Sequence, residues 1–121
     1  DQPIARDPSE RVKMAVVRTG RSAVTEYETI EQFPNGMALV SIRLLTGRTH
    51  QIRVHFAHIG CPVVGDTTYG LRRQQVKLGR TFLHAARLAF DHPATGERLH
   101  FEAPLPSELD GLLSALRKTR I

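Results

Sequence analysis

Alternating apolar and polar positions predict strands in the first part of the chain. Residues 14–17 form a short apolar run, and residues 23–33 and 37–45 alternate between two faces and are rich in β-branched residues. Such period-two patterns are typical of strands. Pro34-Asn35-Gly36, between the last two runs, is a strong turn signal. We therefore predict that these two runs form an antiparallel hairpin.

Residues 1–11 show no apolar period. They are polar, and Pro3 and Pro8 interrupt them. We expect an extended segment that adds nothing to the core.

Apolar residues recur at a helical period further along the chain. Ile52, Phe56 and Ile59 are spaced so that they share one face of a helix. Thr49 is suited to the N-cap, and Gly60 follows the last apolar residue, as glycine does where helices end. We predict a short helix that buries Ile52, Phe56 and Ile59.

The last part of the sequence predicts a second hairpin and a second helix. Residues 65–81 have the glycine and basic content of a loop, whereas residues 82–90 and 98–103 have strand patterns separated by a turn sequence. Ser107 is suited to cap an amphipathic helix whose apolar face is made of leucines. Together the elements predict an α+β fold, a mainly antiparallel mixed sheet with a few flanking helices, in a single domain.

The charge pattern favours a polyanionic partner. The 121 residues carry 17 basic and 12 acidic side chains, and 14 of the basic residues are arginine. Between Arg43 and Phe90 there are eight basic residues and one acid, Asp66. Arginine makes bidentate contacts with phosphate and stacks on bases, so we expect the partner to be nucleic acid. A solvated basic surface without a partner stays open as the alternative.

Cys61 is the one cysteine of the sequence, so an intrachain disulfide is impossible. A chain without disulfides fits a reducing compartment. No apolar run approaches the ~20 residues of a membrane span, and no signal-peptide pattern opens the chain. We expect a cytoplasmic protein that does not bind membranes.

A zinc site is the first chemistry to weigh, because His55, His58 and Cys61 have suitable ligand types and regular spacing. Gly60 and Pro62 end the helix before Cys61, however, and the sequence has no second ligand pair at a zinc-finger spacing. Histidines on a helix surface or in a polar network are the favoured interpretation, and we expect no metal. Nucleophile-elbow, P-loop and dinucleotide-binding motifs do not occur in the sequence.

Residues 47–55 are the stretch richest in polar and basic side chains, and Arg53 is the most informative residue among them. It lies about 100° around the predicted helix from Ile52, beside the apolar face, so we expect it to be partly buried. A buried guanidinium needs a carboxylate or phosphate partner, and no acid of this sequence is an obvious one; an exposed arginine is the alternative. Asp66 could itself be catalytic, but capping of the turn at residues 65–70 or pairing with an arginine is favoured.

Six short runs of the sequence form a distinctive set. The most specific is LTGRTHQIRVH at positions 45–55, and the others are PVVGD at 62–66, YG at 69–70, RTFLHA at 80–85, HPATGE at 92–97 and APLP at 103–106. With these runs, nearly the whole chain resembles the rRNA pseudouridine synthases of the large ribosomal subunit. Thr67 and Thr81 depart from the pattern, since the family usually has proline and often has glutamine there, and neither departure weakens the resemblance.

The resemblance implies that residues 1–121 are the C-terminal part of a catalytic domain with the pseudouridine synthase fold. The family's nucleophilic aspartate lies in an Arg-Leu-Asp-Arg-x-Thr-Ser-Gly type of motif, which belongs to the upstream half and does not occur in this sequence. By resemblance, Ile52 packs at the uracil pocket and Arg53 forms a salt bridge with that aspartate. The residues expected to contact RNA are Arg48, His50, Gln51, Arg72, Arg73, Lys77 and Arg80.

The implied reaction is the isomerisation of uridine to pseudouridine in 23S rRNA, without a metal or a cofactor. The aspartate attacks the target nucleotide, the bond between C1′ and N1 breaks, the uracil turns, and C5 is joined to C1′. Without the nucleophile, we expect this chain alone to be inactive and to self-associate through apolar surface around Ile52 and Phe56. A non-catalytic RNA-binding module is the competing interpretation.

Overall fold

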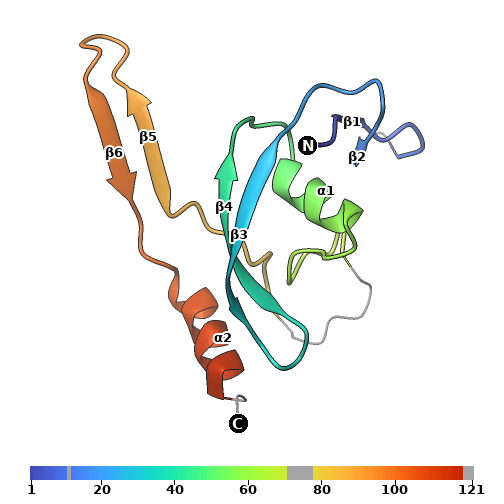
Figure 1. Cartoon of the computed structure of the whole chain (residues 1–121), viewed down its shortest axis with the longest axis vertical. Coiled ribbons are helices and arrows are strands. Elements are labelled where there is room, and N and C mark those ends of the chain that lie inside the picture. Colours follow the sequence, from blue (N-terminus) through green and yellow to red (C-terminus); the bar gives the residue numbers. More distant parts are fainter. Residues whose placement is uncertain (11, 71–77, 119–121) are drawn as a thin grey trace. The chain divides into compact units, whose positions relative to one another are not determined.

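The computed structural model describes residues 1–10, 12–70 and 78–118. The chain divides into two compact units, Asp1–Phe82 and Leu83–Ile121, and each is described by itself (Figure 1). Every strand pair among the described residues is antiparallel, and two helices accompany the strands. The predicted α+β class is therefore confirmed, although the strands form three two-stranded sheets instead of one continuous sheet.

The first unit begins with two short strands, β1 (Ile4–Arg6) and β2 (Met14–Val16), which pair antiparallel. On the other edge of β1, Ile4 and Arg21 exchange two backbone hydrogen bonds, both of 2.9 Å. The N-terminal segment is thus held by backbone pairing on both sides.

The core of the first unit includes a residue from this segment. Ile4 is 1% exposed and clusters with Ala23 and Val54. The expectation that residues 1–11 add nothing to the core was wrong. A single buried isoleucine, placed by backbone hydrogen bonds, produces no apolar period in the sequence.

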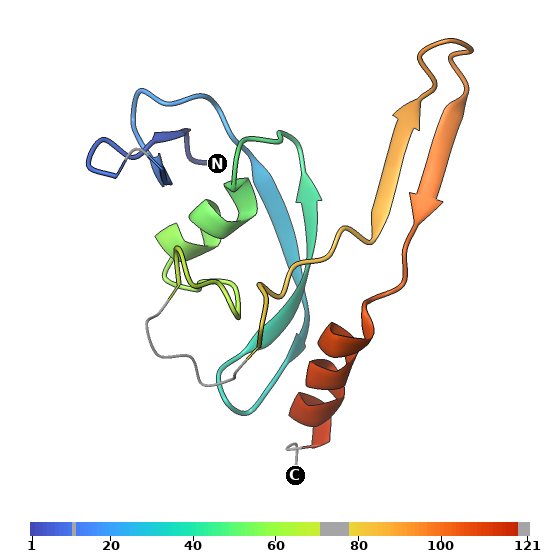
Figure 2. The same cartoon turned by 180° about the vertical axis from the view of Figure 1, so that it is seen from behind.

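The predicted hairpin is confirmed at nearly its predicted bounds (Figure 2). It consists of β3 (Thr25–Gln32) and β4 (Ala38–Leu44), with a register shift between Thr29 and Glu31. Gly36 in the connecting turn has a φ of +87°, a conformation that glycine adopts readily and other residues rarely do. The Asn-Gly signal therefore identified a turn that physically requires glycine.

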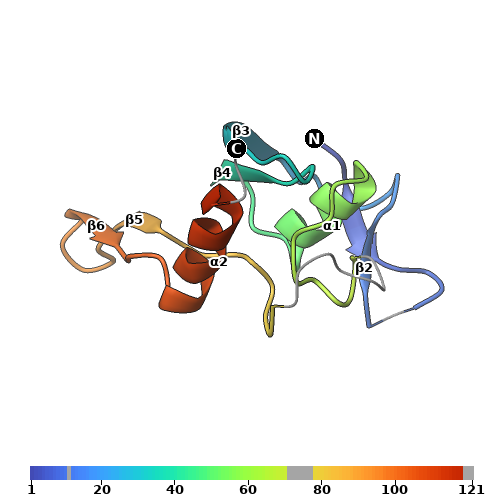
Figure 3. The ribbon, with the colours of Figure 1, turned by 90° about the horizontal axis from the view of Figure 1, so that it is seen from below.

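Helix α1 (Gln51–His58) packs against β2 and β3 (Figure 3). Gly60, with a φ of +80°, follows its end as predicted. The start differs from the prediction, because the N-cap is His50 and not Thr49. His50 has a left-handed backbone, with φ 54°, and makes no side-chain capping hydrogen bond.

The buried face of α1 matches the predicted one at Phe56 only. Ile59 is 53% exposed and Ile52 is only half-buried. Polar side chains take their place, because each of them finds hydrogen-bond partners inside the fold. The residues that α1 buries are Gln51, Val54, His55 and Phe56.

The second unit contains a hairpin and a helix. Its elements are β5 (Arg87–Asp91), β6 (Arg98–Glu102) and α2 (Ser107–Lys118). β5 is shorter than the strand predicted at residues 82–90, whereas β6 and α2 lie close to their predicted bounds. Leu109 and Leu113 of α2 are buried, as the leucine spacing indicated. In the part of the chain that the structure describes, no helix is long and apolar enough to cross a membrane.

Candidate active site

Arg53 and Asp66 form a bidentate ion pair. Nε of Arg53 donates to Oδ2 of Asp66, and Nη2 donates to Oδ1, both at 2.9 Å. Asp66 is fully buried and the Arg53 side chain is 21% exposed, so the predicted partial burial of Arg53 is confirmed. The interpretation that this chain holds no acidic partner for Arg53 was wrong. The pair joins α1 to the turn that follows it with two charge-assisted, directional hydrogen bonds.

The same carboxylate caps the turn that begins at Asp66. The backbone N–H groups of Thr68 and Tyr69 donate to Oδ1 at 3.0 and 3.1 Å. Burial raises the pKa of Asp66, but the hydrogen bonds from Arg53 and from the two backbone groups outweigh it, so the pKa lies below its ordinary value. Asp66 is therefore ionised at neutral pH. The favoured sequence interpretation, turn capping or pairing with an arginine, is confirmed in both of its forms.

Tyr69 connects the turn to α1, through Arg53, and to β2, through Met14. Its ring lies under the guanidinium of Arg53, with Cζ 5.1 Å from the ring centroid, the geometry of a cation–π contact. Its hydroxyl accepts the backbone N–H of Met14 at 3.0 Å and forms a hydrogen bond of 2.7 Å with Nδ1 of His50. The guanidinium is thus held by a carboxylate at its edge and by an aromatic ring at one face.

Gly65, just before the carboxylate, is a position that excludes side chains. Its φ is +81°, and a Cβ added there would overlap the backbone carbonyl of Arg80. The neighbouring Val64 carbonyl accepts the backbone N–H of Phe82 at 2.7 Å. The segment that carries Asp66 is therefore packed closely against residues 80–82.

Gln51 lies inside the fold, where its side-chain amide binds protein groups on both sides. Its Oε1 accepts the Thr46 hydroxyl at 2.7 Å and the Arg48 backbone N–H at 3.0 Å. Its Nε2 donates to the Val24 carbonyl and the Thr25 hydroxyl at 3.0 and 2.9 Å. With 3% exposure, Gln51 cannot be the RNA contact that the sequence predicted; it connects the start of α1 to β3.

His55 is buried in a second polar network. Its Nε2 lies 2.8 Å from the Gln2 carbonyl, which can only accept, and its Nδ1 lies 2.8 Å from the Thr25 hydroxyl. The neutral tautomer with the proton on Nε2 satisfies both partners. Both ring nitrogens of His55 are thus engaged in hydrogen bonds, so His55 is not available as a ligand for the zinc site that the sequence suggested as an alternative. Among the described residues, no three histidine, cysteine or acidic side chains are grouped to hold a metal ion.

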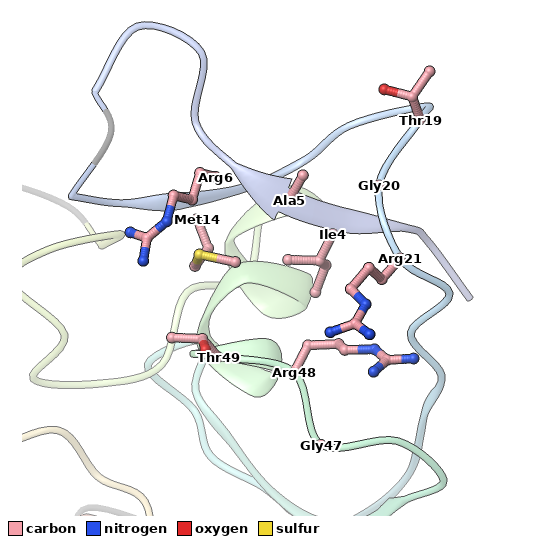
Figure 4. A pocket seen from close by; sticks show the side chains of 10 residues that line it. All are labelled: Ile4, Ala5, Arg6, Met14, Thr19, Gly20, Arg21, Gly47, Arg48 and Thr49. Carbon is pink, nitrogen blue, oxygen red and sulfur yellow. The ribbon is translucent and has the colours of Figure 1, made fainter.

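Arg48 lines a shallow hollow of about 410 Å³. Its Nε donates to the Ser22 carbonyl at 2.8 Å. Arg21, which was not predicted as a site residue, lines the same hollow (Figure 4). Arg6 lines the hollow further along, and none of its described lining residues is acidic. Arginines that line one hollow without an acidic neighbour in it favour a bound anion.

The other predicted site residues have different surroundings. His50 is exposed, apart from its contact with Tyr69. Ile52 is half-buried on α1, and Arg80 is half-buried beside the Asp66 turn. The predicted RNA contacts Arg72, Arg73 and Lys77 lie outside the described residues.

Asp66 was expected from the sequence to cap a turn or to pair with an arginine, but Arg53 was not identified as that arginine, although the sequence contained a signal for it. Asp66 is the one acidic residue between Arg43 and Phe90, and it follows Arg53 closely enough for the end of α1 and one turn to bring them together. Tyr69 and Arg21 had no comparable signal, because their roles depend on tertiary contacts.

Comparison with known proteins gives a consistent result. Residues 2–58 match the family described as RNA pseudouridylate synthase. An uncharacterised RNA pseudouridine synthase of Chloroflexus aurantiacus is 50% identical over 97% of this chain and 37% of its own length. Ribosomal large subunit pseudouridine synthase D of Pseudomonas aeruginosa is 46% identical over 99% of this chain and 41% of its own length. This chain therefore spans about two fifths of the length of these curated relatives.

A solved structure shares the fold. Human RNA Pseudouridylate Synthase Domain Containing 1 is 32% identical, with a TM-score of 0.67, and the match covers 98% of this chain and 58% of the human one. The motif-bearing stretch at residues 45–55 lies within the family match.

Proposed function

Because the chain belongs to the family of RNA pseudouridylate synthases, we propose that it forms the C-terminal part of a catalytic domain that isomerises uridine in 23S rRNA in the cytoplasm. The observation that carries this proposal is the fixed orientation of Arg53. Asp66 and Tyr69 hold its guanidinium, and an arginine held in this way can bind and orient a second anion. The name of the Pseudomonas relative supports large-subunit rRNA as the substrate.

The reaction exchanges one bond at the ribose carbon. The bond between C1′ and N1 breaks, a bond between C1′ and C5 forms, C5 loses its proton, and N1 takes up a proton. We propose that Arg53 binds the nucleophilic aspartate of the other half of the domain, which keeps that carboxylate ionised and oriented. Ile52, half-buried one position before Arg53, would pack at the uracil pocket. No step requires a metal or a cofactor.

RNA binding would use the basic residues around this site. Arg48 is placed with Arg21 at one hollow, and His50 is exposed at the start of α1. Cationic side chains of this kind hold phosphates and fix the register of the RNA without reading its sequence. Arg72, Arg73, Lys77 and Arg80 remain predicted contacts.

The test uses the complete protein, meaning the whole product of the gene that encodes this chain. It is incubated with 23S rRNA labelled with tritium at C5 of uridine, and tritium release is measured, because the proton at C5 leaves in the reaction. We expect release by the complete protein, none by the isolated chain, and a large loss in Arg53→Gln. Arg98→Gln is the matched control, because Arg98 also pairs with an aspartate, Asp91 at 3.2 Å, but on an exposed hairpin.

The competing function is that of a non-catalytic RNA-binding module. Binding of 23S rRNA by the complete protein without tritium release would favour that function and overturn the proposal. Release by the isolated chain would overturn the proposed inactivity of the chain alone.

We also propose that the isolated chain self-associates, although not through the predicted surface. Phe56 is buried, and the ring of Tyr27 covers it edge-on at 5.2 Å. The exposed apolar side chains lie mainly on the strands: Tyr27, Ile30, Leu44, Leu88, Phe90 and Phe101. Exposed apolar strand surface favours pairing between copies. A concentration-independent monomer in light scattering would contradict this.

A further inference from the structure

We infer that Asp66 is a positioning residue for the proposed isomerisation, acting through Arg53 on the nucleophilic carboxylate. This inference rests on the proposed function and adds a residue to it. Asp66 itself is fully buried, so it does not touch the substrate. Its role is to fix the direction in which Arg53 presents its remaining N–H groups.

The geometry of the guanidinium carries the argument. An arginine has five N–H donors in one plane, and two of them, on Nε and Nη2, donate to Asp66 at 2.9 Å. Three remain, two on Nη1 and one on Nη2. Two of these, one on each nitrogen, point from the end of the guanidinium, where they can bind a second carboxylate with two parallel hydrogen bonds. The pair with Asp66 therefore leaves Arg53 able to bind another carboxylate and determines where that carboxylate must lie.

The surroundings of the pair make this direction rigid. Asp66 cannot rotate freely, because its Oδ1 also accepts the N–H groups of Thr68 and Tyr69. The Tyr69 ring lies against the guanidinium, and its hydroxyl is tied to the backbone of Met14 on β2. These contacts hold the otherwise flexible Arg53 side chain in one orientation. A fixed orientation of this kind is needed to position a reacting group efficiently.

Electrostatics distinguish this role from a simpler one. If Asp66 acted only as a nearby negative charge, its removal would leave Arg53 more effective as a cation, and the pKa of the nucleophile would fall. If Asp66 positions Arg53, removal of the Asp66 carboxylate lets Arg53 leave its orientation toward the nucleophile. The pKa of the nucleophile then rises toward its ordinary value. The two roles therefore move the acidic limb of the pH–rate profile in opposite directions.

The experiment measures kcat and KM for tritium release by the complete protein across pH, for the wild type and for Asp66→Asn. Asparagine keeps one oxygen for the turn but removes the charge and one acceptor from the Arg53 fork. We expect kcat to fall on the order of tenfold to a hundredfold, with little change in KM, and the acidic limb to move to higher pH. We also expect Asp66→Asn to have no further effect in an Arg53→Gln background.

Two matched controls separate this effect from general damage. Asp7→Asn alters another turn-capping carboxylate, which accepts the N–H groups of Ser9 and Glu10. Asp91→Asn alters another carboxylate paired with an arginine, on the exposed hairpin. Neither is expected to move the pH profile.

The other groups that face the pair are Tyr69, His50 through its bond to Tyr69, and Arg80, whose carbonyl lies against Gly65. Because His50 forms a hydrogen bond with the Tyr69 hydroxyl, the profiles are also compared in a His50→Asn background. The shift caused by Asp66→Asn should persist there. If Asp66→Asn fails to fold, Asp66→Ser is used, because a serine oxygen can still cap the turn but does not reach Arg53.

An unchanged kcat and pH profile in the Asp66 variant would overturn the inference, as would a shift of the acidic limb to lower pH. A loss of activity that persists in Arg53→Gln, with an unchanged profile, would show that Asp66 supports only the fold. These outcomes differ from a failure of the proposed function itself, in which the wild-type complete protein releases no tritium.

Discussion

The side-chain amide of Gln51 donates to the backbone carbonyl of Val24 over 3.0 Å and so joins the first residue of α1 to the segment that leads into β3. On its other side, the amide oxygen accepts the backbone N–H of Arg48, which lies in the loop that precedes the helix. A buried glutamine at the first helical position thus connects the loop before α1 to the segment that leads into β3, and no side chain caps the helix at His50. Gln51 also fixes the start of the helix that carries Arg53.

We expect Gln51→Leu to lower the free energy of unfolding of the complete protein by about 1–3 kcal/mol, because it leaves the part-buried backbone N–H of Arg48 and the Thr46 hydroxyl without their acceptor. Denaturant unfolding measures this. Gln2→Leu is the control, since Gln2 is exposed and its hydrogen bonds to Ala23 and His55 are made by its backbone, which the substitution keeps. Equal stability of the Gln51 variant and the wild type would mean that solvent replaces this network at no cost.

The pair of Arg53 and Asp66 should make stability depend on pH in the acid range. The pKa of Asp66 is lowered in the folded state, so its stabilising contribution is complete above the ordinary pKa of about 3.9. The contribution is lost as pH falls through the lowered value, when the folded state must take up a proton. We expect the stability difference between the wild type and Asp66→Asn to be constant from about pH 5 to 7 and to shrink below about pH 4. A difference that grows on acidification would contradict this sign.

The sequence predicted the elements better than the contacts between them. The hairpin of β3 and β4, the end of α1 at Gly60 and the helix α2 all follow from local signals, namely alternation, glycine positions and leucine spacing. Each of these signals depends on a few neighbouring residues, so it can be recognised in the sequence without knowledge of the tertiary structure. The motif at residues 45–55 was equally local, and it indicated the family.

What the sequence could not predict depends on partners distant in the chain. Gln51 and His55 are buried because β3 and the N-terminal segment supply hydrogen bonds to them. A rule that buries apolar residues therefore finds Phe56 but misses these two polar residues. Ile4 enters the core through backbone pairing with Arg21. Asp66 meets Arg53 only after Gly60 and the following turn reverse the chain direction.

Gly65→Ala should destabilise the complete protein more than Gly36→Ala does. Both glycines have positive φ, +81° and +87°, and an L-residue in this region costs roughly 1–2 kcal/mol. Gly36 has open space around it, whereas a Cβ at Gly65 would overlap the carbonyl of Arg80. The difference between the two variants in denaturant unfolding therefore isolates the close packing of the segment that carries Asp66. Equal losses would show that this packing can relax.

The hollow between Arg21 and Arg48 should contribute a phosphate contact to RNA binding. We expect Arg21→Gln and Arg48→Gln each to weaken the binding of the complete protein to RNA to a similar extent for different sequences, because phosphate contacts carry no base information. Each should also reduce the slope of log K against log salt by about one. Filter binding at several salt concentrations measures both effects, with Arg98→Gln as the control. A loss of affinity with an unchanged slope would show that these arginines support the loop at Ser22 and Gly47 instead of contacting phosphate.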